Sequence, residues 1–205
     1  VYCYSGHTGQ VAATLLRILG YDAINLKYGM SGWSDDPEVV ATAYFAGAPG
    51  YPTTDVATEL TNGQTPPVLA TGEMTAADVV VAQARAILPE WGPVISPDAV
   101  FENLSDGDES NDPFIVSVRS PEHYALGHIE GAVNIPWKTI ADPASLANLP
   151  TDRPIVVYCY TGHTGQVTAT VLALLGYDVQ NIKWGMMNWS DDADVVATTP
   201  FTAAA

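Results

Sequence analysis

Residues 157–166 read VYCYTGHTGQ, and residues 1–10 read VYCYSGHTGQ. These two loops hold the only cysteines in the sequence, Cys159 and Cys3. In each loop the cysteine ends an apolar run typical of a β-strand, and a short glycine-containing turn leads into an amphipathic helical pattern, which covers residues 166–175 after the second loop. The sequence therefore predicts that each cysteine sulfur lies at the N-terminus of a helix.

A sulfur in that position is expected to be reactive. The first backbone N–H groups of a helix are unpaired and carry the positive end of the helix dipole, so they stabilise an anion. For a cysteine that anion is the thiolate, which is the nucleophilic form. The alternatives are two buried structural cysteines or one disulfide. A core cysteine does not require Gly-His-Thr-Gly after it, and a disulfide does not explain two copies of one loop.

The repeat extends well beyond the cysteine loops. Residues 1–42 and 157–198 align without a gap and are identical at 29 of 42 positions. Each copy has the order strand, cysteine loop, helix and second strand (residues 23–27 and 179–183), followed by Gly-Met, Trp-Ser-Asp-Asp and a short acidic helix. Such a strand–helix–strand unit predicts a parallel sheet with helices on its faces, and the cysteine loop at the carboxyl end of a strand.

Further elements precede the second copy and have no counterpart before the first. Ser96-Pro-Asp is typical of a helix start, with an N-cap and a proline at the first helical position, and the helix is expected to run to about Leu104. Strands are predicted at residues 114–118, 132–135 and 154–159, and a short helix at 121–126.

The run SVRSPEHYALGHIEGAVNIP at residues 117–136, followed by VVYCYTGHTG at 156–165 and by Gly185 and Trp189, resembles the rhodanese sulfurtransferase family. The resemblance begins near Ser96. It implies an α/β fold in which a central parallel sheet is flanked by helices and the active-site loop joins a central strand to a helix. It also implies that Cys159 carries a persulfide during turnover, with Arg119 and Glu122 as structural support.

Two positions depart from the family pattern. The family commonly has Asp-Val-Arg where this chain has Ser117-Val-Arg119. Many members that use thiosulfate carry an Arg or Lys in the loop to hold the dianion, whereas this loop has none. His163 could supply charge if it is protonated, because its ordinary pKa lies near neutrality, or it could be a neutral residue that shapes the loop. His128 is expected to be structural.

The predicted function is transfer of a sulfane sulfur from a donor, such as thiosulfate or another persulfide, to a thiophilic acceptor through a cysteine persulfide. The alternative is a non-catalytic sulfur-carrier or binding module. A cysteine-dependent phosphatase or arsenate reductase usually closes a Cys-x5-Arg loop, but Gly165 and Gly9 stand at that position. We expect no cofactor and no metal, because neither cysteine has a CxxC partner. The candidate site residues are the catalytic Cys159 and Cys3 and the persulfide-binding loops Tyr160, Thr161, Gly162, His163, Thr164, Gly165, Tyr4, Ser5, Gly6, His7, Thr8 and Gly9.

The charge balance limits the partners. Seven basic and 23 acidic residues give a net charge of −16, which argues against nucleic acids and anionic membrane surfaces. The longest apolar runs are too short to cross a bilayer. Small sulfur-containing anions or thiols are the expected partners, and the composition suits an exported or periplasmic protein as well as a cytoplasmic one.

The domain organisation follows from the repeat. We predict that residues 1–50 form the C-terminal half of a first rhodanese-like domain, 51–95 an inter-domain linker with one helix at 75–88, and 96–205 a complete rhodanese-like domain. The first copy lacks a counterpart of residues 114–136, which leaves its sheet edge and its apolar faces uncovered. We therefore expect its missing N-terminal half to come from an upstream segment or a partner chain.

Overall fold

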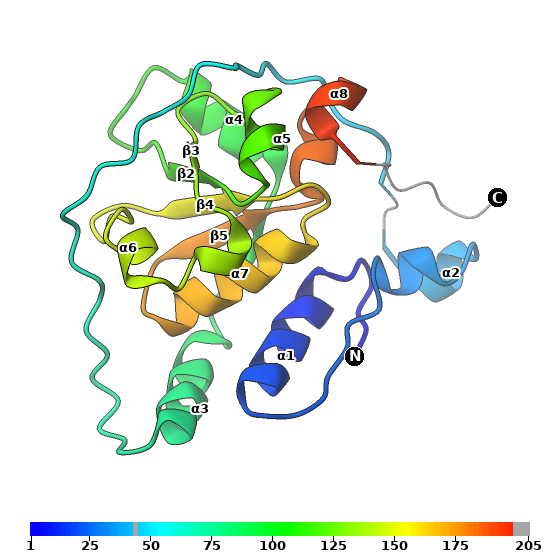
Figure 1. Ribbon diagram of the computed structural model, residues 1–205. Coiled ribbons are helices and arrows are strands. Elements are labelled where there is room, and N and C mark those ends of the chain that lie inside the picture. The colour runs from blue at the N-terminus through cyan, green and yellow to red at the C-terminus, as the bar shows by residue number, and fades with distance from the viewer. Residues whose placement is uncertain (43–44, 199–205) are drawn as a thin grey trace.

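The computed structural model describes residues 1–42 and 45–198, which include a central sheet of five parallel strands. The strands are β1 (Val94–Ile95), β2 (Phe114–Ser117), β3 (Val133–Asn134), β4 (Ile155–Tyr158) and β5 (Val179–Ile182). Their order across the sheet is β1-β5-β4-β2-β3, so β4 lies in the middle. The predicted α/β fold class, with helices on both faces of a parallel sheet, is confirmed (Figure 1).

Every residue of β4 is buried, because the strand has a hydrophobic cluster on each face. Ile155 and Val157 pack towards α7 (His163–Leu174), together with Ala169 and Leu172 of that helix. Val156 and Tyr158 point the other way, into a cluster with residues of α4 (Pro97–Ser105) and α8 (Ala193–Val196). A continuous apolar run is expected of a parallel strand that is covered on both faces. The strand therefore holds Cys159, its next residue, at a rigid position.

The helix starts follow local capping. Ser96, Thr75 and Ser120 each accept a backbone N–H from the first turn of α4, α3 (Ala76–Ile87) and α5 (Pro121–Ala125), respectively. These three helices lie where the sequence predicts them. The remaining helical elements are α1 (His7–Ile18), η1 (Gly29–Gly32), α2 (Pro37–Val40), η2 (Trp137–Thr139), α6 (Pro143–Leu146) and η3 (Gly185–Asn188). No helix among the described residues combines the length and the apolar character needed to cross a membrane.

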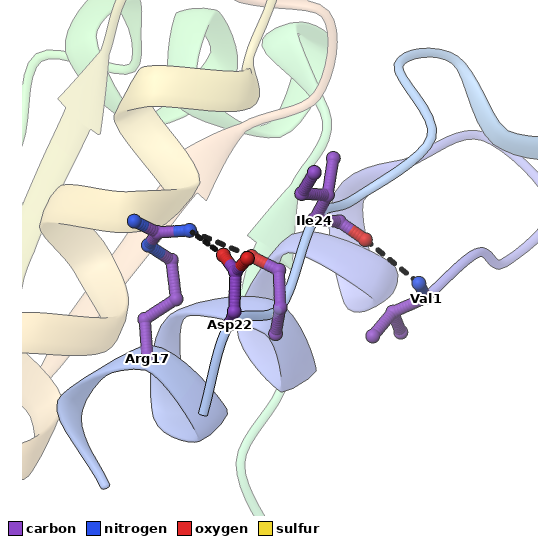
Figure 2. Close-up of polar contacts among 5 residues, drawn as sticks. Val1, Arg17, Asp22 and Ile24 are labelled. Carbon is purple, nitrogen blue, oxygen red and sulfur yellow. Dashed lines mark hydrogen bonds and ion pairs between the residues drawn. The ribbon is translucent and has the colours of Figure 1, made fainter. Parts of the chain in front are cut away.

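The first copy forms its helices but neither of its two expected strands. The expected strand that ends at Cys3 and the expected strand at 23–27 are both wrong, because residues 1–42, all of them described, contain no strand. Residues 1–3 do run beside 24–26: the Val1 nitrogen donates to Ile24 O at 2.7 Å (Figure 2), and Leu26 N donates to Val1 O at 2.9 Å. In the complete domain, β4 pairs with β5 on one side and with β2 on the other. The described residues place no strand where the equivalent of β2 would lie beside residues 1–3, so residues 1–3 pair with one neighbouring segment.

Other contacts in the first copy hold the turn after α1. Arg17 Nη1 donates to Asp22 Oδ1 at 3.3 Å (Figure 2). It also donates to Ala23 O at 3.1 Å. Both charged side chains are mostly exposed, so the ion pair adds little stability. The main packing of this copy is that of α1 against α7, and Figure 1 shows α1 beside α7 and away from the sheet.

The segment between the copies is bound to the second one. Trp189 Nε1 donates to Pro52 O at 2.9 Å, and Thr54 forms an isolated antiparallel bridge with His128. The chain then runs around the sheet to α3 (Figure 1), which packs against α7. Ile87 and Trp91 reach the α7-side cluster. Residues 53–88 thus provide no strand to the first copy. Positions 43–44 and 199–205, which belong to the predicted first and last domains, lie outside the described residues.

Candidate active site

The Cys159 loop joins the end of β4 to the start of α7. Gly162, the N-cap of α7, has a φ of 83°, and its N–H donates to Cys159 Sγ at 3.1 Å. Glycine adopts this left-handed conformation at little cost. A Cβ at this position would also overlap His7 Nε2 and come within 2.9 Å of Trp184 N. The turn that aims an amide at the sulfur therefore depends on glycine for its backbone angle and for its close packing.

Backbone hydrogen bonds from η3 hold the Cys159 loop in place. Met186 N donates to Cys159 O at 2.8 Å, and Met187 N donates to Tyr160 O at 3.0 Å. Gly185, with a φ of 58°, passes so close to the Cys159 carbonyl that a Cβ there would lie 2.5 Å from its oxygen. Cys159 itself is only 1% exposed. Cys159 is therefore held in a buried, hydrogen-bonded turn.

Asn181 and its counterpart Asn25 brace the two cysteine loops. Asn181 Nδ2 donates to Gly162 O at 2.9 Å, and Asn25 Nδ2 donates to Gly6 O at 2.9 Å. Gly165 leaves room for the Asn181 side chain, which a Cβ would overlap. Sequence reasoning missed this pair. The sequence feature that could have indicated this pair is that asparagine occupies the same position, 25 and 181, in the second strand segment of both copies.

The Tyr160 side chain contacts α5 and its N-cap residue. Its Oη accepts from Ser120 N at 3.1 Å and lies 2.7 Å from His123 Nδ1. This contact joins the cysteine loop to the segment that carries Arg119, and nothing local in the sequence indicates it. The matching Tyr4 is 58% exposed.

The residues expected to give structural support differ in burial. Arg119 is fully buried, and its guanidinium donates to Val195 O and Gly127 O and lies 5.6 Å from the centroid of the Tyr158 ring. It thus ties α8 and the turn after α5 to the strand that carries the loop. Glu122 is exposed, and its own N–H and the Ser120 hydroxyl hold the pKa of its carboxyl below the ordinary value.

His128 is fully buried, and its contacts are with the protein. Its ring stacks on Tyr124 with centroids 3.7 Å apart, and its two nitrogens lie 3.0 Å from Tyr124 O and 3.1 Å from Val56 O. These contacts fit the structural role expected from the sequence.

The Cys3 loop repeats the same geometry in a more open setting. Gly6 N donates to Cys3 Sγ at 3.1 Å, and Cys3 is partly exposed. Burial alone would raise the pKa of this thiol, but hydrogen bonds from the Thr8 side chain and from the backbone of Gly9, Ser5 and Gly6 outweigh it, so the pKa is lowered. The loop therefore stabilises a thiolate with no Arg or Lys in it.

The two copies meet through a reciprocal exchange of histidines. His7 Nε2 accepts from Trp184 N at 3.1 Å, and His163 Nε2 accepts from Tyr28 N at 3.2 Å. The two rings are stacked with centroids 5.5 Å apart. Each cysteine loop therefore contributes its histidine to the backbone of the other copy, and the structure brings the two predicted loops into contact.

This exchange makes His163 a neutral residue. A backbone N–H only donates, so Nε2 must be the unprotonated nitrogen, and Nδ1 carries the proton towards Thr161 Oγ1 at 3.1 Å. Burial, with a smaller repulsion from Lys27, lowers the pKa of His163 to about 4. Burial, with repulsion from His163 and Lys183, lowers that of His7 to about 3. Of the two alternatives for His163, the neutral residue that shapes the loop is favoured.

Known proteins are similar to this chain in the region that contains the Cys159 loop. Residues 96–192 match the model of the family described as Rhodanese-like domain. The thiosulfate sulfurtransferase GlpE of Pseudomonas aeruginosa is 32% identical over 96 residues, which cover 46% of this chain and 81% of the relative. GlpE of Ectopseudomonas mendocina is 35% identical over 96 residues, covering 46% and 82%. The chain belongs to the rhodanese family.

One further curated protein and one solved structure are also similar to part of this chain. The HTH-type transcriptional regulator Rv0324 of Mycobacterium tuberculosis is 37% identical over 117 residues, which cover 55% of this chain and 48% of that protein. A crystal structure of a rhodanese-like domain protein from Staphylococcus aureus is 30% identical and covers 48% of this chain and 92% of that chain, with a TM-score of 0.43.

Proposed function

We propose that this protein is a sulfurtransferase in which Cys159 accepts a sulfane sulfur and passes it to a thiophilic acceptor. The observation that carries the proposal is the position of Cys159 Sγ, which lies at the end of the central strand and accepts the Gly162 N–H at the first turn of α7. A sulfur anion placed there meets backbone N–H groups and the positive end of a 12-residue helix.

The chemistry requires only the sulfur nucleophile and a donor. The Cys159 thiolate attacks the outer sulfur of thiosulfate, the sulfur–sulfur bond of the donor breaks, and sulfite leaves with the electron pair. The product is a Cys159 persulfide anion. An acceptor nucleophile, such as a thiolate or cyanide, then attacks the terminal sulfur, and the Cys159 thiolate leaves. A donor persulfide reacts in the same way, with a thiolate as the leaving group.

Backbone amides supply the stabilisation in this proposal. The loop has no Arg or Lys, and His163 is neutral and occupied by Tyr28 N. The left-handed turn at Gly162 directs an N–H inward, and such backbone turns bind anions. The matching Cys3 loop supports this view, because hydrogen bonds from its own residues lower the pKa of its thiol.

The decisive experiment is mass spectrometry of the protein after exposure to thiosulfate, together with sulfur-transfer assays. The chain should gain one sulfur atom on Cys159 that is removed by dithiothreitol. Cys159→Ser should remove that gain and most turnover while the fold is kept, because the hydroxyl is similar in size but far less nucleophilic. Cys3→Ser is the matched control for the other loop. Turnover at the original rate in the double variant would rule out the proposal.

A further inference from the structure

The first copy exposes an apolar face whose counterpart in the second copy is core. Tyr2 is 65% exposed and Trp33 73%, whereas the matching Tyr158 and Trp189 are 0% and 2% exposed. Tyr2, Leu26, Met30 and Trp33 line a hollow of about 330 Å³. The repeat aligns them with Tyr158, Ile182, Met186 and Trp189, which all lie in one buried cluster.

The second copy shows what covers this face. The cluster around Tyr158 and Trp189 is completed by Val100 of α4, Ile115 of β2, and Ile129 and Ala132 between α5 and β3. Strand β2 also pairs in parallel with β4, with Ser117 beside Tyr158. All of these groups belong to residues 97–134, which precede the repeated unit. The covering element is therefore a helix–strand–helix–strand segment, made of α4, β2, α5 and β3, and its strand β2 has a defined register with β4.

Among the residues that the structure describes, 97–134 is the one segment of this kind, and it is already packed against the second copy. Ile115, Val100 and Ile129 are buried against the second copy, and Ile129 N donates to Tyr158 Oη. A second molecule of this chain therefore cannot offer the same surface to the first copy without unfolding its own domain. The linker does not cover the face either, because no residue of 51–95 lines the hollow.

We propose that the face formed by Tyr2, Leu26, Met30 and Trp33 binds a helix–strand–helix–strand segment equivalent to residues 97–134, carried on the same polypeptide ahead of Val1. The strand of this segment that is equivalent to β2 lies parallel to residues 1–3, on the side that β2 occupies beside β4. Its apolar side chains fill the hollow, and the first copy becomes a second closed rhodanese-like domain. The same polypeptide is the source because residues 137–154 connect the covering segment to β4 in this way in the second copy.

The test is an extended chain in which residues 93–156 are duplicated directly before Val1. Val156 then precedes Val1 as it precedes Val157, so the register is kept without a designed linker. Hydrogen exchange of peptides 1–6 and 24–34 is compared with that of 157–162 and 180–190. We expect exchange in the first two peptides to become at least about tenfold slower and to approach that of the second pair.

Two controls make the result decisive. The extended chain with Ile115→Asp in the added segment alone should lose the new protection, because a buried carboxylate prevents this segment from packing, while peptides 157–162 stay protected. Sedimentation of the unextended chain should show a monomer in which peptides 1–6 and 24–34 exchange quickly. The proposal is overturned if the extension leaves these peptides unprotected. It is also overturned if the unextended chain forms a dimer that protects them.

Discussion

His7 and His163 each accept a backbone N–H from the opposite copy of the repeat, and their rings stack with centroids 5.5 Å apart. The contact is symmetric in its chemistry, because Trp184 and Tyr28 occupy matching positions, both with φ near 65°. The two cysteine loops are therefore coupled at the residue that begins each helix, and the stability of this interface depends on two neutral imidazoles.

Acid should weaken this interface. The pKa values of His7 and His163 in the folded protein, about 3 and about 4, lie below the ordinary 6.5. Below pH 6.5 the unfolded chain therefore binds more protons than the folded one. The contribution of the two neutral histidines to the free energy of unfolding is complete above about pH 6.5, and it is lost as the pH falls to about 4 for His163 and to about 3 for His7. The loss is on the order of 3 kcal/mol for His163 at pH 4.

Urea unfolding at pH 7, 5.5 and 4.5 measures this dependence. Because many carboxylates also titrate in this range, the comparison is with a His7→Gln, His163→Gln double variant. We expect the variant to be less stable at pH 7 and to lose less stability between pH 7 and 4.5. If the free energy of unfolding depends on pH in the same way in both proteins, the assignment of two neutral histidines to this interface is contradicted.

Gly162 should be far less replaceable than Gly20. Both have φ between 80° and 95°, but a Cβ at Gly20 meets nothing within 4 Å, whereas one at Gly162 overlaps His7 and approaches Trp184 N. Gly20→Ala should cost only the left-handed backbone penalty of about 1–2 kcal/mol. Gly162→Ala should cost clearly more in denaturant unfolding, because the interface must open. If both variants lose the same free energy of unfolding, the close approach of Gly162 to His7 and Trp184 N does not contribute to stability.

The two matching tryptophans should differ in their contribution to stability. Trp189→Ala removes a side chain that is 2% exposed and should destabilise the protein by about 3–5 kcal/mol. Trp33→Ala removes one that is 73% exposed and should change the free energy of unfolding by less than about 0.5 kcal/mol. Thermal or urea unfolding of both variants checks this. A large loss for Trp33→Ala would mean that its face is already covered.

Tyr160→Phe should destabilise the protein, whereas Tyr4→Phe should not. The Tyr160 hydroxyl accepts from Ser120 N and contacts His123, and its removal leaves the Ser120 N–H without this acceptor, at a cost of about 1–3 kcal/mol. Tyr4 is largely exposed and serves as the matched control. Denaturant midpoints that shift equally would argue against a role for this contact.

His163→Gln should slow sulfur transfer only modestly, because the residue is neutral and its Nε2 faces Tyr28 N. We expect less than about a tenfold loss, or ~1.4 kcal/mol of barrier. The rate is measured with thiosulfate and a thiol or cyanide acceptor, with His7→Gln as the control. A thousandfold loss would show that His163 carries charge to the donor and that the backbone amides are insufficient.

Much of the structure of residues 96–198 can be predicted from the sequence alone. The helix starts at Ser96 and Ser120 depend on hydroxyl caps that bond within three residues. The strand before Cys159 follows from an unbroken apolar run, and the turn at Gly162 from glycine at the helix start. These features are local, so the information that specifies them lies within a few residues.

Tertiary structure decided the rest. Val1-Tyr2-Cys3 and Val157-Tyr158-Cys159 are identical in sequence, yet only the second ends a strand, because a strand in the middle of a sheet needs partners on both sides and β2 pairs only with β3 and β4. The neutral state of His163 likewise depends on Tyr28, which is 135 residues away in the chain, and that of His7 on Trp184, 177 residues away. The burial and the hydrogen bonds that keep these two histidines neutral arise only when distant segments of the chain pack together. Local sequence patterns therefore cannot predict them.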